Sequence, residues 1–285
     1  GQGLGNQMWS YYALRLIAKR LKCPFSILGL KHFKGSDFIS ISPGKPISHP
    51  IKEIPCNSLF PPFEKYFSER QIVHSIEYCD IRGFDSRCLQ IQPNTLIDGY
   101  FQSEELVQTV SHDINDLFQI KDIPDLNHLT SDDTCVLNVR GGEYVRNRRL
   151  TLNRRYWHNA MKRMRIEKGV KKFVIVTDDP AYAKGLLPNL PVLDQNMHSD
   201  FVALTKARNV IISNSSFSYF PLRFNKQRPY IIAPKYWARH NVSDGYWACR
   251  SNIYRDYNYL DRHGHITDGT QCTIEADEFL SQLTS

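Results

Sequence analysis

The chain has 285 residues and a formal net charge of +7, and hydrophobic and charged residues make up 41% and 23% of it. This ordinary globular composition and length suit one large or two ordinary domains. The seven cysteines include no C-x-x-C pair, and no apolar run approaches the roughly 18 residues of a membrane span, which argues against zinc, redox and transmembrane motifs.

A glycine-rich stretch, residues 1–7, opens the chain and leads directly into a helical pattern over residues 8–21. A glycine loop at a helix N-terminus exposes backbone N–H groups that suit an anion or a polar sugar, although an ordinary tight connection uses the same residues. A dinucleotide fingerprint needs an acidic residue downstream, which is missing here. We expect Gly3, Gly5 and Asn6 to face a ligand, and we expect a leading strand or an upstream membrane anchor to have been removed.

The remainder of the first half is less regular. Residues 25–30 predict a strand, and residues 31–75 form a long Pro-, Ser-, Lys- and Gly-rich insertion of the kind that often carries acceptor contacts. Residues 96–102 predict a short strand that ends in a polar, aromatic loop before the next helix. The Pro- and Asp-rich stretch 120–134 is typical of a linker, so we place a first α/β domain at residues 1–125.

The second half alternates strands and helices repeatedly, which predicts a parallel sheet with helices on both faces. Its apolar runs predict strands at residues 136–139, 173–176, 191–193, 210–212 and 230–233. We therefore place a second, Rossmann-like domain at residues 126–235. Residues 236–285 are aromatic and show no period, so we expect an irregular tail that packs across the body.

Three loops that follow these strands, residues 138–144, 177–180 and 213–217, should emerge at the same edge of a parallel sheet, where ligands bind. The guanidinium of Arg140 suits a phosphate, and the two glycines after it let a ligand approach the backbone closely. The hydroxyl-rich loop 213–217 has the chemistry of a phosphate cradle. The plainer interpretations are a surface Arg–Glu pair and a Ser-rich turn that caps a helix. Together the loops predict a nucleotide-diphosphate site that uses neither a P-loop lysine nor a metal cluster.

Asp178 and Asp179 are adjacent, unlike the spaced carboxylates of D-x-D metal sites, and the following Pro180 predicts the start of a helix. We therefore expect no metal at this loop.

Basic residues cluster at 146–149, 154–155 and 162–172. Such a patch suits nucleic acid, an anionic membrane or a phosphorylated substrate, whereas a solvated helix face is the plainer interpretation for residues 162–168. Because no interleaved aromatic residues or zinc finger accompany it, we expect no nucleic-acid partner and keep peripheral membrane association as the hypothesis for the patch. The oligomeric state stays open.

Five motifs follow one another along the chain: GQGLGNQM at the start, DGYFQSE at 98–104, VRGGEY at 139–144, TDDP at 177–180 and IISNSSFSYF at 211–220. In this order they resemble the α-1,2-fucosyltransferases of glycosyltransferase family 11, from residue 1 to about Trp237. The resemblance implies a GT-B-like fold of two Rossmann-like α/β domains with a cleft between them. It also implies an inverting transfer of L-fucose from GDP-β-L-fucose to a sugar hydroxyl, in α-1,2 linkage to galactose, without a metal or other cofactor.

The sequence departs from the family's H-x-R-R-G-D-Y pattern at Asn138, Gly141 and Glu143, whereas Arg140 keeps its place. The aromatic pair 219–220 is Tyr-Phe where the family has Trp-Trp. If the family's histidine touches the nucleotide base, Asn138 recognises the base differently, so a different nucleotide sugar or a divergent acceptor stays open.

The chemistry of inverting transfer assigns the main role to Arg140. Negative charge grows on the leaving diphosphate, and a fixed guanidinium in a dry site stabilises it. We expect the donor to contact residues of the glycine-rich start and of the three loops, namely Gly3, Gly5, Asn138, Arg140, Asp200, Asn214, Ser215, Ser216 and Phe217. The role of Asp200, contact with guanine or ribose, is implied by the resemblance, and its alternative is a helix cap.

We expect Asn6 to lie near the reacting centre, and Glu143 and Asp98 are the candidates for the base that removes the acceptor proton. Glu143 equally suits a salt bridge to Arg140. The acceptor side is expected to include Asp98, Tyr100 and Gln102.

Two alternatives remain open at this point: a transferase of the same fold with another nucleotide sugar, and a non-catalytic relative that binds glycans or polyanions. A bacterial protein with these features would be cytoplasmic or peripheral to the membrane, and a eukaryotic one would lie in the Golgi lumen with its anchor removed.

Overall fold

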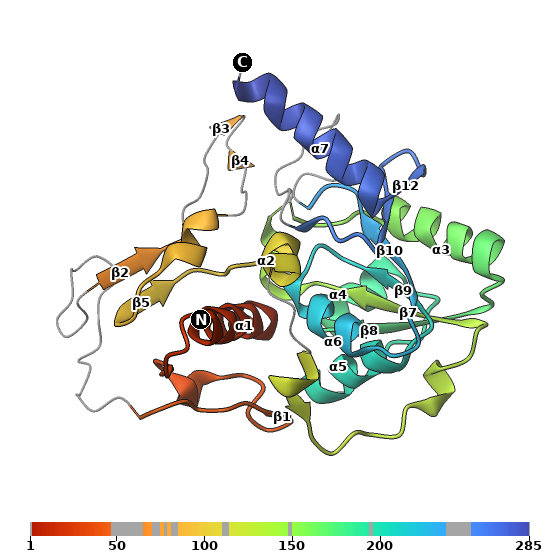
Figure 1. Cartoon of the computed structure of the whole chain (residues 1–285). Helices are drawn as coiled ribbons and strands as arrows, with labels where there is room; N and C mark the ends of the chain where they lie inside the picture. Colours follow the sequence, from red (N-terminus) through yellow and green to blue (C-terminus); the bar gives the residue numbers. More distant parts are fainter. Residues whose placement is uncertain are drawn as a thin grey trace. The chain divides into compact units, whose positions relative to one another are not determined.

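The computed structural model describes residues 2–46, 65–69, 75–76, 79–80, 85–109, 114–147, 150–193, 196–237 and 252–284. The chain divides into two compact units (Figure 1). Unit 1 comprises Gly1–Ile72 and Gly83–Lys121, and unit 2 comprises Val73–Arg82 and Asp122–Ser285.

Unit 1 is built around a buried helix, α1 (Leu4–Arg20), whose inner side carries Met8, Trp9 and Ala13. Its short elements are η1 (Leu30–His32), β1 (Ile39–Ser40), β2 (Lys65–Ser68), η2 (Ser86–Gln90), β5 (Thr95–Asp98), α2 (Glu104–Thr109), η3 (Ile114–Asp116) and β6 (Gln119–Ile120). Among the described strands of this unit, β2 pairs in parallel with β5 and β1 pairs antiparallel with β6.

Two local predictions for unit 1 are wrong. Residues 25–30 do not form a strand, because only Ser26 makes a bridge, to Gly44, and Gly29 turns the chain at a φ of +68°. The glycine-rich start is not a loop over residues 1–7, since α1 already begins at Leu4 with Gly3 as its N-cap. The helix can begin this early because Leu4 and Gly5 in its first turn are buried.

Unit 2 contains a six-stranded sheet in the order β12-β11-β10-β9-β7-β8. Its strands are β7 (Thr134–Val139), β8 (Lys172–Thr177), β9 (Asn209–Ile212), β10 (Tyr230–Pro234), β11 (Asn258–Leu260) and β12 (Ile266–Asp268). All neighbouring pairs are parallel except β11 and β12. The predicted α/β class with a parallel sheet is thus confirmed, and the strand expected at 191–193 is a single bridge between Val192 and Ile175 at the β8 edge.

Helices cover both faces of this sheet. They are α3 (Arg154–Lys168), α4 (Pro180–Leu186), α5 (Met197–Lys206), α6 (Tyr219–Phe224) and α7 (Gly269–Thr284), and the 3-10 turns are η4 (Asn127–Leu129), η5 (Gly142–Arg146) and η6 (Ser216–Ser218). One core joins the buried side of α3 to Leu137, Val139 and Ile211 of the sheet. Because side chains alternate along a strand, Val136 and Asn138 point to the opposite face, which the mutually packed α5 and α6 cover.

The C-terminal segment is not the irregular tail that the sequence predicted. Over residues 252–284 it adds β11 and β12 to the sheet and ends in α7 (Figure 1). Tyr259 and Leu260 of the three-residue β11 are buried, and Cys272 and Ala276 of α7 are buried four residues apart. The strands are too short to show a period, which is why the sequence pattern missed them. Residues 238–251 lie outside the described part of the chain.

The helices described here include none with the length and apolarity needed to cross a membrane.

A buried hydrogen bond fixes α3 to the carboxyl end of β9, since the hydroxyl of Tyr156 donates to the carbonyl of Ile212 over 2.6 Å. Replacing Tyr156 by Phe leaves that carbonyl unsatisfied, so we expect the free energy of unfolding to fall by about 1–3 kcal/mol. Urea unfolding measures this, with Tyr182→Phe as the matched control, because the Tyr182 hydroxyl makes no hydrogen bond among the described residues. Equal losses in the two variants would contradict the role of this hydrogen bond.

Candidate active site

The strand order of unit 2 fixes where a ligand is expected. β8 lies on one side of β7, the first of the parallel strands, and β9 and β10 follow on the other side. Chain connections therefore leave β7 and β9 in opposite directions, and open α/β sheets bind ligands outside the carboxyl ends of two such strands. Arg140 follows β7, and Ser213 follows β9, its N–H donating to the carbonyl of Asn138 over 3.1 Å. The three predicted loops do emerge at this one edge.

Arg140 is held there by two carboxylates. Its Nη1 lies 2.6 Å from Oδ2 of Asp178, and its Nη2 lies 3.1 Å from Oε1 of Glu143. The guanidinium also lies over the ring of Tyr144, 5.1 Å from the ring centroid. The predicted Arg–Glu salt bridge thus exists, and the structure adds Asp178 as a second partner.

The two glycines after Arg140 contact the loop that follows β8, which the sequence analysis did not predict. Gly141 donates its N–H to Oδ1 of Asp178 over 2.8 Å, and Gly142 donates to Oδ2 of Asp179 over 3.2 Å. A Cβ on Gly141 would lie 2.4 Å from Cβ of Asp179, and Gly142 has a φ of +51°. The neighbouring loop therefore makes use of the close approach that glycine permits at these two positions.

The loop after β8 is also the start of a helix, as Pro180 predicted. Asp179 is the N-cap of α4, and its Oδ1 accepts from the N–H of Tyr182 over 3.0 Å. Both aspartates therefore join the β7 loop to the β8 loop.

The loop after β9 forms the helix-capping turn, the plainer of the two interpretations that the sequence left open. The hydroxyl of Ser215 caps η6 by accepting from the N–H of Phe217 over 3.4 Å, as the plainer interpretation held. Nδ2 of Asn214 donates to the carbonyls of Leu150, over 3.0 Å, and of Trp237. Ser216 and Phe217 lie half-buried at the surface of the loop.

Several buried polar atoms at this edge have no hydrogen-bond partner among the described residues. They are Oδ1 of Asn138, Oδ1 of Asp200, Oγ of Ser213 and Oδ1 of Asn214. Buried polar atoms are nearly always hydrogen-bonded in native proteins, so these four atoms are candidates for contacts with a bound ligand. Amide and carboxylate oxygens accept, so a ligand that matches them carries N–H or O–H donors.

Asp200 is the most perturbed acid at this edge. It is only 6% exposed. Burial raises the pKa of Asp200 to about 7, a backbone hydrogen bond from Thr177 opposes the shift, and the charge of Asp178 adds to it. The alternative of a helix cap is wrong, because Asn196 caps α5 by accepting from the N–H of Ser199 over 3.0 Å.

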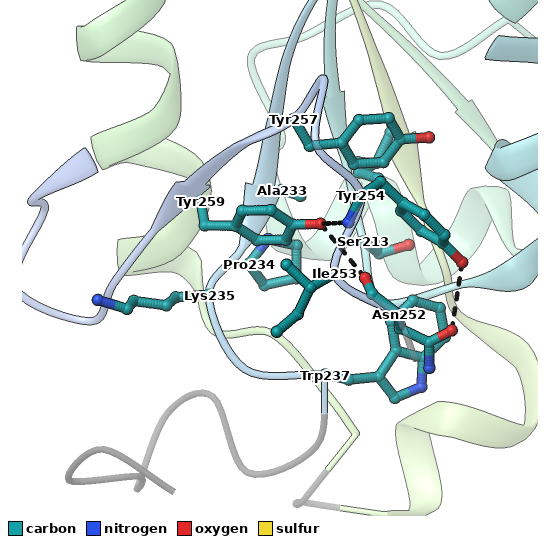
Figure 2. A pocket seen from close by; sticks show the side chains of 11 residues that line it. Ser213, Ala233, Pro234, Lys235, Trp237, Asn252, Ile253, Tyr254, Tyr257 and Tyr259 are labelled. Atoms are coloured by element: carbon teal, nitrogen blue, oxygen red, sulfur yellow. Dashed lines mark hydrogen bonds between the residues drawn. The ribbon is translucent and has the colours of Figure 1, made fainter. Parts of the chain in front are cut away.

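A small cavity lies behind the β9 loop, at the carboxyl ends of β9 and β10 (Figure 2). It measures about 20 Å³ and is lined by Ser213 and by Tyr254, Tyr257 and Tyr259 of the C-terminal segment. The Tyr259 hydroxyl accepts from the N–H of Tyr254 over 2.7 Å and donates to the carbonyl of Asn252 over 3.2 Å, which holds the wall together. This volume suits about one water molecule and not a nucleotide base.

The site residues predicted in the first half belong to unit 1, at the junction of α1 with the loop after β5. Oδ1 of Asn6 accepts from Nε2 of Gln102 over 2.7 Å, so these two predicted residues do meet. Gly3 is the N-cap of α1, and Gly5 is buried in its first turn. Asp98 ends β5, and Tyr100 is exposed two residues later.

Two residues that the sequence analysis missed hold this loop. One carboxylate oxygen of Glu69 accepts from the N–H groups of Tyr100 and Phe101, over 2.8 and 3.0 Å, and Phe101 adopts a φ of +52°. The hydroxyl of Tyr66 donates to Oδ2 of Asp98 over 2.9 Å. Both lie in the long insertion, where β2 is only four residues long and shows no alternation of polar and apolar residues that would signal a strand.

Several side chains of the basic patch make contacts within unit 2. Arg154 donates to the carbonyls of Leu186 and Gly185 at the end of α4, over 2.8 and 2.9 Å. Arg163 donates to the carbonyl of Gly264, and Lys168 lies over the ring of Tyr230. Arg148 and Arg149 lie outside the described residues.

The model of glycosyl transferase family 11 matches residues 4–260, and the chain belongs to this family. It is 23% identical over 292 residues to the O-antigen biosynthesis glycosyltransferase WbnK of Escherichia coli, across 84% of this chain and 93% of that protein. A crystal structure of POFUT1 in complex with GDP matches about half of each chain, 53% and 56%, with a TM-score of 0.34 and 13% identity. The resemblance seen in the motifs is confirmed, and the protein is a glycosyltransferase.

The raised pKa of Asp200 predicts a pH dependence of stability. The folded protein binds this proton more tightly than the unfolded chain, so the stabilisation is complete below about pH 4 and is lost as the pH rises through about 7. Between pH 5 and pH 8 we expect this group to remove about 2–3 kcal/mol from the free energy of unfolding.

Asp200→Asn resembles the protonated carboxyl and should abolish that part of the pH dependence. Urea unfolding of both proteins at pH 5 and pH 8 gives the comparison, and the variant should gain on the wild type at pH 8. Parallel pH profiles would show that Asp200 is an ordinary acid.

Proposed function

We propose that unit 2 binds GDP-β-L-fucose and that the enzyme transfers L-fucose with inversion to a sugar hydroxyl, in α-1,2 linkage to galactose. The observation that carries the proposal is Arg140, fixed at the carboxyl end of β7 beside unsatisfied buried acceptors, in a member of glycosyl transferase family 11. The resemblance of the motifs supports the sugar and the linkage.

The chemistry follows from where charge develops. The acceptor oxygen attacks the anomeric carbon while the bond from that carbon to the diphosphate oxygen breaks on the opposite side. The electron pair of the broken bond stays on the diphosphate, where the guanidinium of Arg140 stabilises it. Ser216 and Phe217, in the loop after β9, bind the same diphosphate in this proposal, as the residues of phosphate-binding turns do. In this proposal the enzyme uses no divalent metal, because the arginine supplies the positive charge.

The unsatisfied atoms favour guanine as the base. The Watson–Crick edge of guanine presents a ring N–H and an amino group, both donors. Asn138 and Asp200 share one face of the sheet and present buried oxygen acceptors. Uracil and cytosine offer fewer donors on that edge, so they satisfy fewer of these atoms. In this proposal the amide oxygen of Asn138 accepts from guanine at the position where the family's motif has histidine.

We place the acceptor sugar on unit 1, at the loop that follows β5. Tyr66 and Tyr100 are 47% and 37% exposed there, and aromatic rings of this kind pack against the apolar faces of sugars. Asp98 is our choice for the base that takes the acceptor proton, because it makes no ion pair among the described residues. Glu143, the other candidate, is bonded to Arg140.

Nucleotide binding gives the first test. We expect GDP to raise the melting temperature of the protein by mass action, equally with and without EDTA, and UDP and CMP to raise it less. A larger shift with UDP or CMP would overturn the choice of donor, and an EDTA-sensitive shift with GDP would overturn the metal-independent mechanism.

Arg140→Ala tests the mechanism. Removing the group that stabilises the leaving diphosphate should lower kcat about 10²–10³-fold, or roughly 3–4 kcal/mol, while the protein stays folded. Arg155→Ala is the control, since it removes an equal charge from the exposed side of α3. Transfer assays with labelled GDP-fucose measure both, and wild-type turnover in Arg140→Ala would contradict the mechanism.

A further inference from the structure

We infer that the two carboxylates on Arg140 have different roles: Asp178 is a positioning residue that stays on the guanidinium, and Glu143 leaves it when the donor diphosphate binds. The inference rests on the proposed function, because the diphosphate is the anion that replaces Glu143.

Asp178 is held from several sides. Val139 and Thr177 are opposite each other in the parallel register of β7 and β8, so Arg140 and Asp178 occupy the next opposed positions. One Asp178 oxygen bonds Arg140 over 2.6 Å, and the other accepts from the N–H of Gly141 over 2.8 Å. The Asp178 side chain is 35% exposed, and a Cβ on Gly142 would lie 2.8 Å from its Oδ2. Moving Asp178 would therefore break a backbone hydrogen bond as well as the ion pair.

Glu143 is held only by the arginine. Its side chain is 78% exposed, it lies on the short turn η5, and its carboxylate makes no other hydrogen bond among the described residues. Exposed ion pairs of this kind contribute about 0–1 kcal/mol, so a bound anion displaces the carboxylate easily. The same exposure lets the released Glu143 regain water.

Asp178 and Glu143 contact different nitrogen atoms of the guanidinium, and this difference assigns a role to each carboxylate. Asp178 occupies Nη1, whereas Glu143 occupies Nη2, which shares the side edge of the guanidinium with Nε. A phosphate that binds an arginine by two parallel hydrogen bonds along that edge uses Nε and Nη2. Departure of Glu143 therefore frees the edge that such a phosphate needs, while Asp178 keeps the plane of the guanidinium fixed.

Charge supports the same division. With both carboxylates in place, Arg140 carries one positive charge against two negative ones, which repels a diphosphate. When Glu143 leaves, Arg140 and Asp178 remain as a pair without net charge. The diphosphate then meets Nε and Nη2 of a guanidinium that Asp178 holds in place.

The test is a titration of GDP into the full-length wild type, Glu143→Gln and Asp178→Asn, followed by transfer kinetics. We expect Glu143→Gln to bind GDP about threefold or more tightly, because its competitor has lost its charge. We expect Asp178→Asn to bind GDP more weakly and to lower kcat at least tenfold, with the KM for the acceptor unchanged. Asp132→Asn, which removes a charge from the exposed Asp132–Arg208 pair, should leave GDP affinity as in the wild type.

A double-mutant cycle separates positioning from a structural role. In an Arg140→Ala background both substitutions should change GDP affinity less than they do with Arg140 present, since the contact with the guanidinium is gone and only the charge of each carboxylate still acts on the diphosphate. Effects of undiminished size in that background, or unchanged or weaker GDP binding by Glu143→Gln with Arg140 present, would overturn the inference. Glu143→Gln is an exposed substitution and keeps the test decisive if Asp178→Asn does not fold. Failure of the wild type to bind GDP would instead overturn the proposed function itself.

Discussion

The parallel pairing of β7 with β8 on one side and β9 on the other is the constraint on which the site depends. All six residues of β7 are buried, so its register cannot slip without moving its apolar side chains between faces. The pairs Val139–Thr177 and Asn138–Ile212 bring the two neighbouring strands to an end beside Arg140. The geometry of Arg140, Asp178 and Ser213 is thus a consequence of how the core packs.

A second consequence is electrostatic, because the positive charge of Arg140 lies beside several acidic side chains. Asp178 holds Arg140, stabilises the β7 loop through Gly141 and adds to the raised pKa of Asp200. Such acids help a site that binds an anionic donor only if one of them holds the arginine in place and another leaves the arginine when the donor binds. The difference in exposure between Asp178 and Glu143 separates these two tasks.

The positions of the strands were predictable from the sequence where the apolar runs were long, whereas the contacts made by individual residues were not. The apolar runs ending at Val139, Val176 and Ile212 located β7, β8 and β9 and therefore the edge that carries Arg140. The partners of Gly141 and Gly142 were missed, because a glycine pair signals close approach without saying what approaches. Glu69 was missed because its role depends on a contact with Tyr100, 31 residues further along the chain. β11 escaped because its three residues cannot display a period.

The most direct test of the account is the anomeric configuration of the product formed from GDP-β-L-fucose and a β-galactoside acceptor, read by proton NMR. We predict an α-linked fucose on the galactose 2-hydroxyl, formed with release of one GDP per transfer. A β-linked product, or transfer from another nucleotide sugar in preference to GDP-fucose, would contradict it.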